Sequence, residues 1–455
     1  MEHKDTVNFW LEANGLFEKS CSEMDQVWQK RKRILDTKWL VIFILKMVLS
    51  KNKQGYASNL HYLWEMCAEK GITLPQTDSV APSSVCEARQ KLPETIFKIL
   101  NGELISLWHR HRETPLWKGH QVFAIDGSKI NAPRGLLNHG YKIASNTTRH
   151  YPYAMMSCLY SLQEQLVYDA ELVSHGDERS CAIEHLKHLR GGDLVIFDRG
   201  YFSYLMLYRA MEFKVHAVFR LQSGAANSKV TAFWNSDKVD EVIDYSPSLG
   251  VRYDLKKRGY TLDFKAFTIR LVKHKIGKET YVYATTLTDA SQYPVDCFAD
   301  LYHGRWGIEE LYKISKHFID VEDFHSQTER GVKQEIYGHF LLANIARLFE
   351  TDARKNAASD QETEGGQKPE DKDTASIENT GRPFKINFKN CLAVVGRHLE
   401  NLILGSGKLI TSWLNKAMLN VSRIKQRVRP NRSYPRVSFK PRTRWNSLRS
   451  SLKNA

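Results

Sequence analysis

Two acidic residues of this sequence each follow a short apolar run. Asp126 comes directly after Val122–Ile125, and Asp198 comes directly after Leu194–Phe197. Such runs, ended by a polar turn, are typical of buried strands, so both carboxylates should emerge where a strand ends. Catalytic and ligand-binding groups collect at these ends in α/β sheets. An ordinary Asp-Gly turn is the simpler explanation for Asp126 taken alone.

A third acid, Glu309, lies in a segment predicted to form one long helix from Pro294 to about Ile319. Glu310 projects about 100° away from it and cannot share its edge. Because successive residues of a helix are about 100° apart, four side chains of this segment fall within one wedge roughly 60° wide: Tyr302, Arg305, Glu309 and Lys316. An Arg–Glu pair on a solvated helix face is the simpler alternative for this stripe alone.

Together the three carboxylates suit phosphodiester chemistry assisted by two metal ions. Asp126, Asp198 and Glu309 would supply the hard oxygen ligands that Mg²⁺ and Mn²⁺ prefer. One ion would activate water or a 3′-hydroxyl, and the other would stabilise the leaving oxygen. The cations that flank Glu309, Arg305 and Lys316, would then bind the phosphates beside the cleaved bond.

These motifs resemble those of the DDE transposases of the insertion sequence 4 family. The family signature Tyr-x2-Arg-x3-Glu-x6-Lys matches the Tyr302–Lys316 segment, and the two Asp motifs match Ile125–Ser128 and Phe197–Tyr201. Val218–Arg220 resembles the family's strand after the second Asp. The likeness covers about residues 80 to 345, together with the basic segment 432–436.

The resemblance implies a ribonuclease-H-like catalytic domain, with a mixed five-stranded sheet and a β-rich insertion. Asp126 would lie on the first strand, Asp198 after the fourth and Glu309 on a late helix, and the three would hold two Mg²⁺ or Mn²⁺ ions. It also implies a homodimer on paired transposon ends that acts on double-stranded DNA, both terminal inverted repeats and target. Expected DNA contacts are Tyr302, Arg305, Lys316, Arg199 and Arg220.

Some relatives flip a base onto a tryptophan of the insertion. Trp234 is the only tryptophan in that part of this chain, but no motif aligns it with the flipping residue. A structural role for Trp234 is therefore the favoured interpretation.

Composition and periodicity divide the chain into six segments. Residues 1–117 should be a helical DNA-binding domain, and residues 118–222 and 286–349 the two parts of the catalytic domain. The insertion, 223–285, should contain strands at Arg252–Leu255, Phe264–Leu271 and Thr280–Thr286. Residues 350–382 hold nine Asp and Glu and read as a disordered acidic linker. Residues 383–455 should form one amphipathic helix, Cys391–Leu419, and a basic tail.

The charge balance favours a polyanionic partner. The chain carries 66 Lys and Arg against 51 Asp and Glu, a net charge of +15, which suits nucleic acid, with an anionic membrane surface as the rival. No apolar run has the ~18 residues of a spanning helix, and no signal peptide is visible, so a cytoplasmic protein is expected. Seven scattered cysteines without Cys-x2-Cys spacing argue against a zinc ribbon or a disulfide framework.

Two alternatives to an active transposase are open at this point. One is a regulatory descendant that binds DNA without cutting it, although the intact set of Asp126, Asp198 and Glu309 argues against that reading. The other is a nuclease of the same fold that cleaves DNA without strand transfer.

Overall fold

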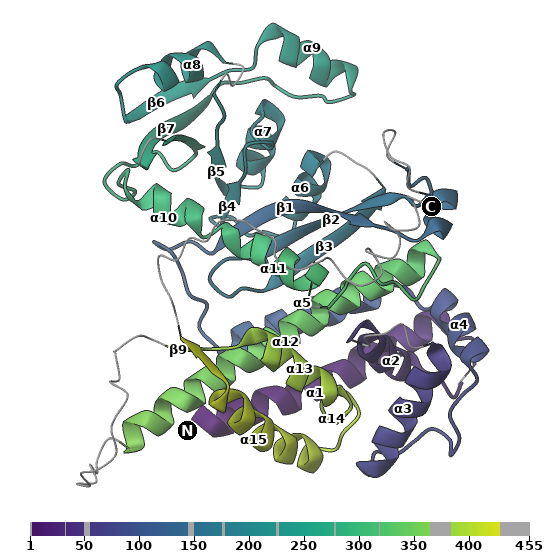
Figure 1. Ribbon diagram of the computed structural model, residues 1–455. Coiled ribbons are helices and arrows are strands. Elements are labelled where there is room, and N and C mark those ends of the chain that lie inside the picture. The colour runs from purple at the N-terminus through teal and green to yellow at the C-terminus, as the bar shows by residue number, and fades with distance from the viewer. Residues whose placement is uncertain are drawn as a thin grey trace, which may run out of the picture.

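The computed structural model describes residues 2–31, 33–49, 55–143, 150–174, 178–223, 227–276, 279–317, 319–364 and 384–427. These residues form a mixed α/β fold in which helices from both ends of the chain lie on one side of a twisted sheet (Figure 1). No helix in these ranges is both long and apolar enough to cross a membrane.

The sheet has eight strands in the order β3-β2-β1-β4-β5-β8-β7-β6. β1, β4 and β5 are parallel to one another, and all other neighbours are antiparallel. The strands are β1 (Val122–Asn131), β2 (Tyr153–Ser161), β3 (Val167–Ser174), β4 (Leu194–Phe197), β5 (His216–Arg220), β6 (Asp240–Tyr245), β7 (Phe267–Ile276) and β8 (Glu279–Thr285). The expected five strands are therefore correct only for the first part of the sheet. β8 pairs with β5, so the three strands of the insertion extend the sheet to eight.

Helices cover both faces of the central strands, which explains the unbroken apolar runs. Phe123 and Ile125 are buried in a core with α6 (Glu178–Leu186) and α7 (Tyr204–Glu212). Ala124, between them, belongs to a second core on the opposite face, with α5 (Thr95–His111), α11 (Trp306–His317) and α12 (Glu329–Glu364). Because successive side chains of a strand point to opposite faces, a strand covered on both sides must be apolar throughout.

The second core also joins the two ends of the described chain. α12 packs against helices from the N-terminal part and against helices that follow the acidic segment. From the N-terminal part these are α1 (Glu2–Trp28), α2 (Thr37–Leu49), α4 (Pro82–Lys91) and α5, and after the acidic segment they are α13 (Phe388–Arg397) and α15 (Gly407–Arg423). α3 (Tyr56–Glu69) packs on α2 and α4, and α14 (Leu399–Ile403) packs on α1, α2 and α15. The segment Cys391–Leu419 is helical as expected, and it is divided among α13, α14 and α15. Figure 1 shows these helices gathered along α12, away from the insertion.

The acidic segment 350–382 does not begin as an irregular linker. α12 continues to Glu364, and Asp352 is fully buried, where it accepts hydrogen bonds from the Trp10 indole at 3.2 Å and from Arg112 at 3.1 Å. A buried carboxylate needs such partners, so these bonds order the first residues of the segment. Residues 365–382 lie outside the described residues.

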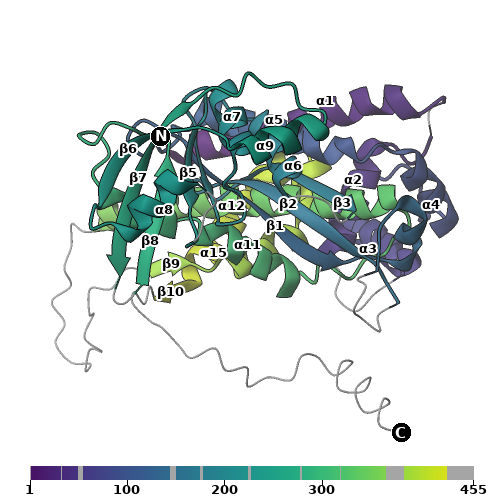
Figure 2. The same ribbon diagram turned by 90° about the horizontal axis from the view of Figure 1, so that it is seen from above.

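The insertion contains two helices as well as strands, α8 (Ser228–Asn235) and α9 (Leu249–Lys257). The strand expected at Arg252–Leu255 is wrong, since these residues lie in α9. The Ser248 hydroxyl caps this helix by accepting from the Val251 amide at 3.3 Å. A four-residue run of mixed polarity cannot separate strand from helix, and this cap decides for helix. Figure 2 shows α8 and the strands of the insertion at one end of the molecule and α3 and α4 at the other, with α9 nearer the middle.

The helix expected from Pro294 to about Ile319 is broken into α10 (Cys297–His303) and α11. Around the break, the amides of Arg305, Gly307 and Ile308 each bond to the carbonyl three residues earlier. Gly307 packs at the break against Tyr160, whose ring would lie 3.2 Å from an added Cβ. The remaining short elements are η1 (Arg134–His139), β9 (Phe384–Ile386) and β10 (Lys425–Arg427).

Candidate active site

The sequence predicts Asp126 at the end of a strand, but the residue lies inside β1. β1 pairs with β4 only from Val122 to Ala124, whereas its pairing with β2 continues to Asn131. The side of β1 toward β4 is therefore open beside Asp126, whose side chain is 21% exposed. Asp198 follows the last residue of β4 directly, as expected. The early end of β4 thus leaves both carboxylates at one opening in the sheet.

Tyr302, at the end of α10, fixes the position of Asp198. Its hydroxyl donates to Asp198 Oδ1 at 2.7 Å, and its ring is almost completely buried. Burial, together with the nearby Asp198 charge, raises the pKa of Tyr302 to about 12 and outweighs the opposing charge of Arg305. The phenol therefore remains protonated and keeps donating.

Arg305 joins the other two carboxylates across the break between α10 and α11. Its Nη2 donates to Glu309 Oε1 at 2.6 Å, and its Nη1 lies 3.7 Å from Asp126 Oδ2. Arg305 is only 4% exposed, and its guanidinium also stacks over the Tyr302 ring at 5.5 Å. Glu310, by contrast, points to solvent and pairs with Lys313. The predicted distinction between Glu309 and Glu310 agrees with this geometry.

The two aspartates have opposite pKa shifts. Burial raises the pKa of Asp126 to about 6, against the lowering effect of Arg305, and the charges of Glu178 and Asp198 add to the rise. Burial also acts to raise the pKa of Asp198. Hydrogen bonds from Tyr302 and from the Arg199 backbone amide outweigh it and hold that pKa below its ordinary value. Asp198 is thus ionised at neutral pH, while Asp126 is a desolvated carboxylate short of positive charge.

The other predicted DNA-binding residues are only partly gathered here. Arg220, at the end of β5, stacks its guanidinium over the Tyr281 ring at 4.7 Å and the Tyr302 ring at 5.6 Å, which places it at the site. Lys316 does not join the carboxylates. Its ammonium donates to the carbonyl of Lys129 at 2.6 Å, three residues along β1 from Asp126.

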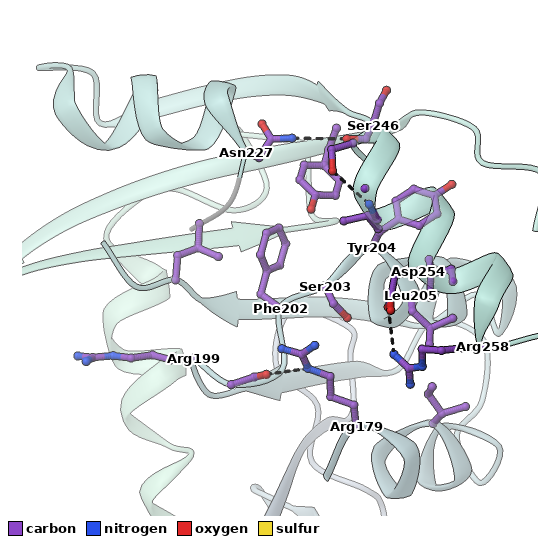
Figure 3. A pocket seen from close by; sticks show the side chains of 18 of the residues that line it. Arg179, Arg199, Phe202, Ser203, Tyr204, Leu205, Asn227, Ser246, Asp254 and Arg258 are labelled. Carbon is purple, nitrogen blue, oxygen red and sulfur yellow. Dashed lines mark hydrogen bonds and ion pairs between the residues drawn. The ribbon is translucent and has the colours of Figure 1, made fainter. Parts of the chain in front are cut away.

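Arg199 is exposed and lines a neighbouring pocket. This cavity of about 570 Å³ opens between α6, α7 and α9, and Arg179 and Arg258 also line it. Figure 3 shows Arg199 and Arg258 on opposite sides of it. Trp234, on α8, packs against the core of the insertion, and its carbonyl accepts from Lys273 Nζ at 3.1 Å.

Sequence reasoning missed three residues around the carboxylates. Tyr312 is buried on α11 and donates to the Asp126 carbonyl at 2.7 Å, which ties that helix to β1. Glu178 and Tyr201 approach Asp126 from the other face of the sheet. Tyr312 belongs to the apolar flank of the predicted helix, a signal that could have identified it. No spacing rule brings Glu178 to this site.

The carboxylates suit a divalent cation by their chemistry. Asp126, Asp198 and Glu309 offer hard oxygen donors, and Asp126 is desolvated without a hydrogen bond from another side chain among those described. Within the described part of the chain, however, no three His, Cys, Asp or Glu side chains converge closely enough to hold one ion. Arg305 lies against Asp126 and Glu309 instead and supplies part of the positive charge that they need.

Comparisons with known proteins agree with these motifs. The family model for the transposase DDE domain matches residues 117–345, about half of the chain. The transposase InsG of insertion sequence element IS4 from Escherichia coli (strain K12) is 26% identical over 327 residues, which is 70% of each protein. Among solved structures, the piggyBac transposase synaptic complex with hairpin DNA matches with a TM-score of 0.39 and 10% identity, over 91% of this chain and 82% of that chain.

The family match spans both aspartates, the broken helix and the first part of the long helix behind it, so it includes the elements that carry the site's side chains. The chain belongs to the family of proteins that contain a transposase DDE domain.

Proposed function

We propose that this chain is a cut-and-paste DNA transposase that cleaves transposon ends and joins them to target DNA. The observation that carries this proposal is the linkage of five side chains at one opening of the sheet. Tyr302 holds Asp198, while Arg305 holds Glu309 and lies beside Asp126. The order β3-β2-β1-β4-β5, with β1, β4 and β5 parallel, supports a ribonuclease-H-like assignment for this part of the sheet.

Asp126, Asp198 and Glu309 would hold two divalent cations, Mg²⁺ or Mn²⁺. Such ions activate the attacking water or 3′-hydroxyl and stabilise the leaving oxygen of the phosphodiester. Ionised Asp198 is ready to accept a cation, whereas Asp126 would first release any bound proton. Arg305 would have to give up part of its contact with Asp126, and it is then placed to meet a DNA phosphate instead.

The basic side chains around the site would contact the DNA. Arg220 lies over the Tyr302 ring, Arg199 follows Asp198 and lines the neighbouring pocket, and Lys316 lies against β1 at Lys129. We propose that residues 1–117 read the terminal inverted repeats, because they are largely helical and almost all of them precede the family match, which begins at residue 117. The active form would be a homodimer on paired ends.

Three isosteric substitutions test this function. Asp126→Asn, Asp198→Asn and Glu309→Gln should each abolish cleavage, with at least about a hundredfold loss, because amides are poor ligands for Mg²⁺. Gel shifts on end-sequence DNA should be nearly unchanged, since most DNA contacts lie elsewhere. Nicking assays in Mg²⁺ and in Mn²⁺ measure the first effect.

Glu310→Gln is the matched control, since Glu310 is exposed and its ion pair with Lys313 is local. This variant should cut like the parent protein. An inactive Glu310→Gln beside an active Glu309→Gln would overturn the assignment. Cleavage without joined donor–target products in the parent protein would favour a nuclease over a transposase.

A further inference from the structure

The first turn of α6 lies against both segments that carry the aspartates. Glu178, its first residue, packs on Gly127, where an added Cβ would lie 3.3 Å from the Glu178 Cγ and 3.5 Å from its Cδ. Arg179 Nε donates to the Gly200 carbonyl at 2.9 Å, in the turn that follows Asp198 (Figure 3). The Glu178 carboxylate is therefore held next to Asp126 by contacts to β1 and to the turn after β4. Gly127 has no side chain that would obstruct this approach.

Tyr201 provides a second and independent observation. The turn after β4 folds it back, with its amide donating to the Asp198 carbonyl at 3.1 Å. Its side chain is only 2% exposed, yet its hydroxyl has no hydrogen-bond partner among the described residues. After burial itself, the charges of Asp126 and Glu178 are the main causes that raise its pKa. The hydroxyl is thus a buried donor without an acceptor in the described part of the chain, close enough to these carboxylates to feel their charge.

A buried donor without an acceptor destabilises the folded state, because it has lost its hydrogen bond to water. Several carboxylates around a single guanidinium are also unfavourable, and Glu178 adds to the rise in the pKa of Asp126. Both features are explained if the opening between β1 and β4 takes up further positive charge together with its bound water. A cation there would offset the acids, and its water would give Tyr201 an acceptor.

We propose that Glu178 is a fourth carboxylate of the cation site, acting with Asp126 on divalent cations, and that Tyr201 is a positioning residue that donates into this site. This inference rests on the proposed function, which places Asp126, Asp198 and Glu309 around the same cations. The proposed fourth carboxylate comes from α6, the helix that also lines the pocket of Arg179, Arg199 and Arg258.

Mn²⁺ binding to the full chain without DNA, measured by the electron paramagnetic resonance signal of free Mn²⁺, tests the proposal. Glu178→Gln should weaken the affinity by about tenfold or more, as loss of a residue that ligates or orients a metal ligand does. The control is Glu184→Gln on the same helix, where the side chain is 60% exposed and pairs with Lys187. It should bind Mn²⁺ like the parent protein.

Tyr201→Phe separates a cation role from a packing role. In EDTA this variant should be at least as thermally stable as the parent, because it removes a buried hydroxyl without a partner. With Mn²⁺ its melting temperature should rise less than that of the parent. An equal Mn²⁺-induced rise would overturn the role of Tyr201.

Asp126→Asn distinguishes a failure of the proposed role of Glu178 from a failure of the proposed metal-dependent function. Parent-like Mn²⁺ binding by Glu178→Gln, combined with weakened binding by Asp126→Asn, would overturn the role of Glu178 alone. Parent-like binding by Asp126→Asn would overturn the cation site itself.

Discussion

Asp126 sits in surroundings that oppose its own charge. Its desolvation at the end of the β1–β4 pairing costs free energy whenever the carboxylate is ionised and no cation is bound. Active sites commonly hold such unfavourable charges, because the ligand that they are built to bind supplies the compensation. The charge of the neighbouring Asp198 is not opposed in this way, since Tyr302 and a backbone amide donate hydrogen bonds to its carboxylate.

The conflict predicts a pH-dependent stabilisation by Asp126→Asn. The folded-state pKa is about 6, above the ordinary value of 3.8, so ionisation of Asp126 destabilises the fold as pH rises from about 4 through 6. In EDTA at about pH 7.5, Asp126→Asn should raise the free energy of unfolding by roughly 1–3 kcal/mol. At pH 4 the two proteins should differ little. Urea denaturation at both pH values measures this, and equal stabilities at pH 7.5 would contradict it.

At the scale of elements, a histidine holds the helix of Glu309 against the long helix behind it. His339, on α12, is fully buried and contacts Ser315 of α11, with 2.8 Å between Nε2 and Oγ. The Ser315 hydroxyl already donates to the Leu311 carbonyl at 2.9 Å, so His339 Nε2 must be the donor between them. Nδ1 is then an unprotonated nitrogen without a partner among the described residues.

This arrangement predicts acid sensitivity. Burial lowers the pKa of His339 to about 4 from its ordinary 6.5, so its contribution to stability is complete above pH 6.5 and is lost as the pH falls toward 4. The glutamine of His339→Gln cannot titrate but keeps a donor for Ser315. The free energy of unfolding of this variant should therefore fall by about 3 kcal/mol less than that of the parent over that pH range. The control is His303→Gln, at an exposed histidine, and its free energy of unfolding should fall as much as that of the parent. Denaturant titrations at several pH values would show the difference.

How far the sequence predicts these elements depends on how local their causes are. The strands before Asp126 and Asp198 were predicted because a strand covered on both faces must be apolar throughout. The break between α10 and α11 was not, since it depends on the fit of Gly307 against Tyr160, a residue of β2. The helical form of α9 was missed for a different reason, because its run of apolar and basic residues suits either structure.

The site also combines residues that the local sequence predicts with residues that only tertiary packing brings together. The residues Tyr302, Arg305 and Glu309 meet as their spacing predicted, although the helix that was meant to align them is interrupted. Lys316 belongs to the same signature but bonds elsewhere, since it is anchored at Lys129. Glu178 could not be predicted, because only the packing of α6 on β1 brings it to Asp126.

At the scale of the whole molecule, α12 connects the eight-stranded sheet to both ends of the described chain. The helices after the acidic segment pack on α12 and α2, and Val421 of α15 is buried in that shared core. β10 then pairs with β9 as far as Arg427. The described part of the chain has its boundary at Arg427, and the basic residues 428–455 lie outside it.

This boundary defines a clean truncation. Residues 428–455 contain eight Lys and Arg and no Asp or Glu, so their charge should serve DNA binding rather than the fold. Deleting them should flatten the slope of log K against log salt by about 0.9 for each phosphate that the tail neutralises, several units in all, and weaken binding to all sequences alike. Cleavage at low salt should persist, because every residue of the site remains. The competing explanation is that the tail stabilises the folded protein. An unchanged slope together with a lower melting temperature would support that explanation, whereas an unchanged melting temperature with a flattened slope would assign the tail to DNA.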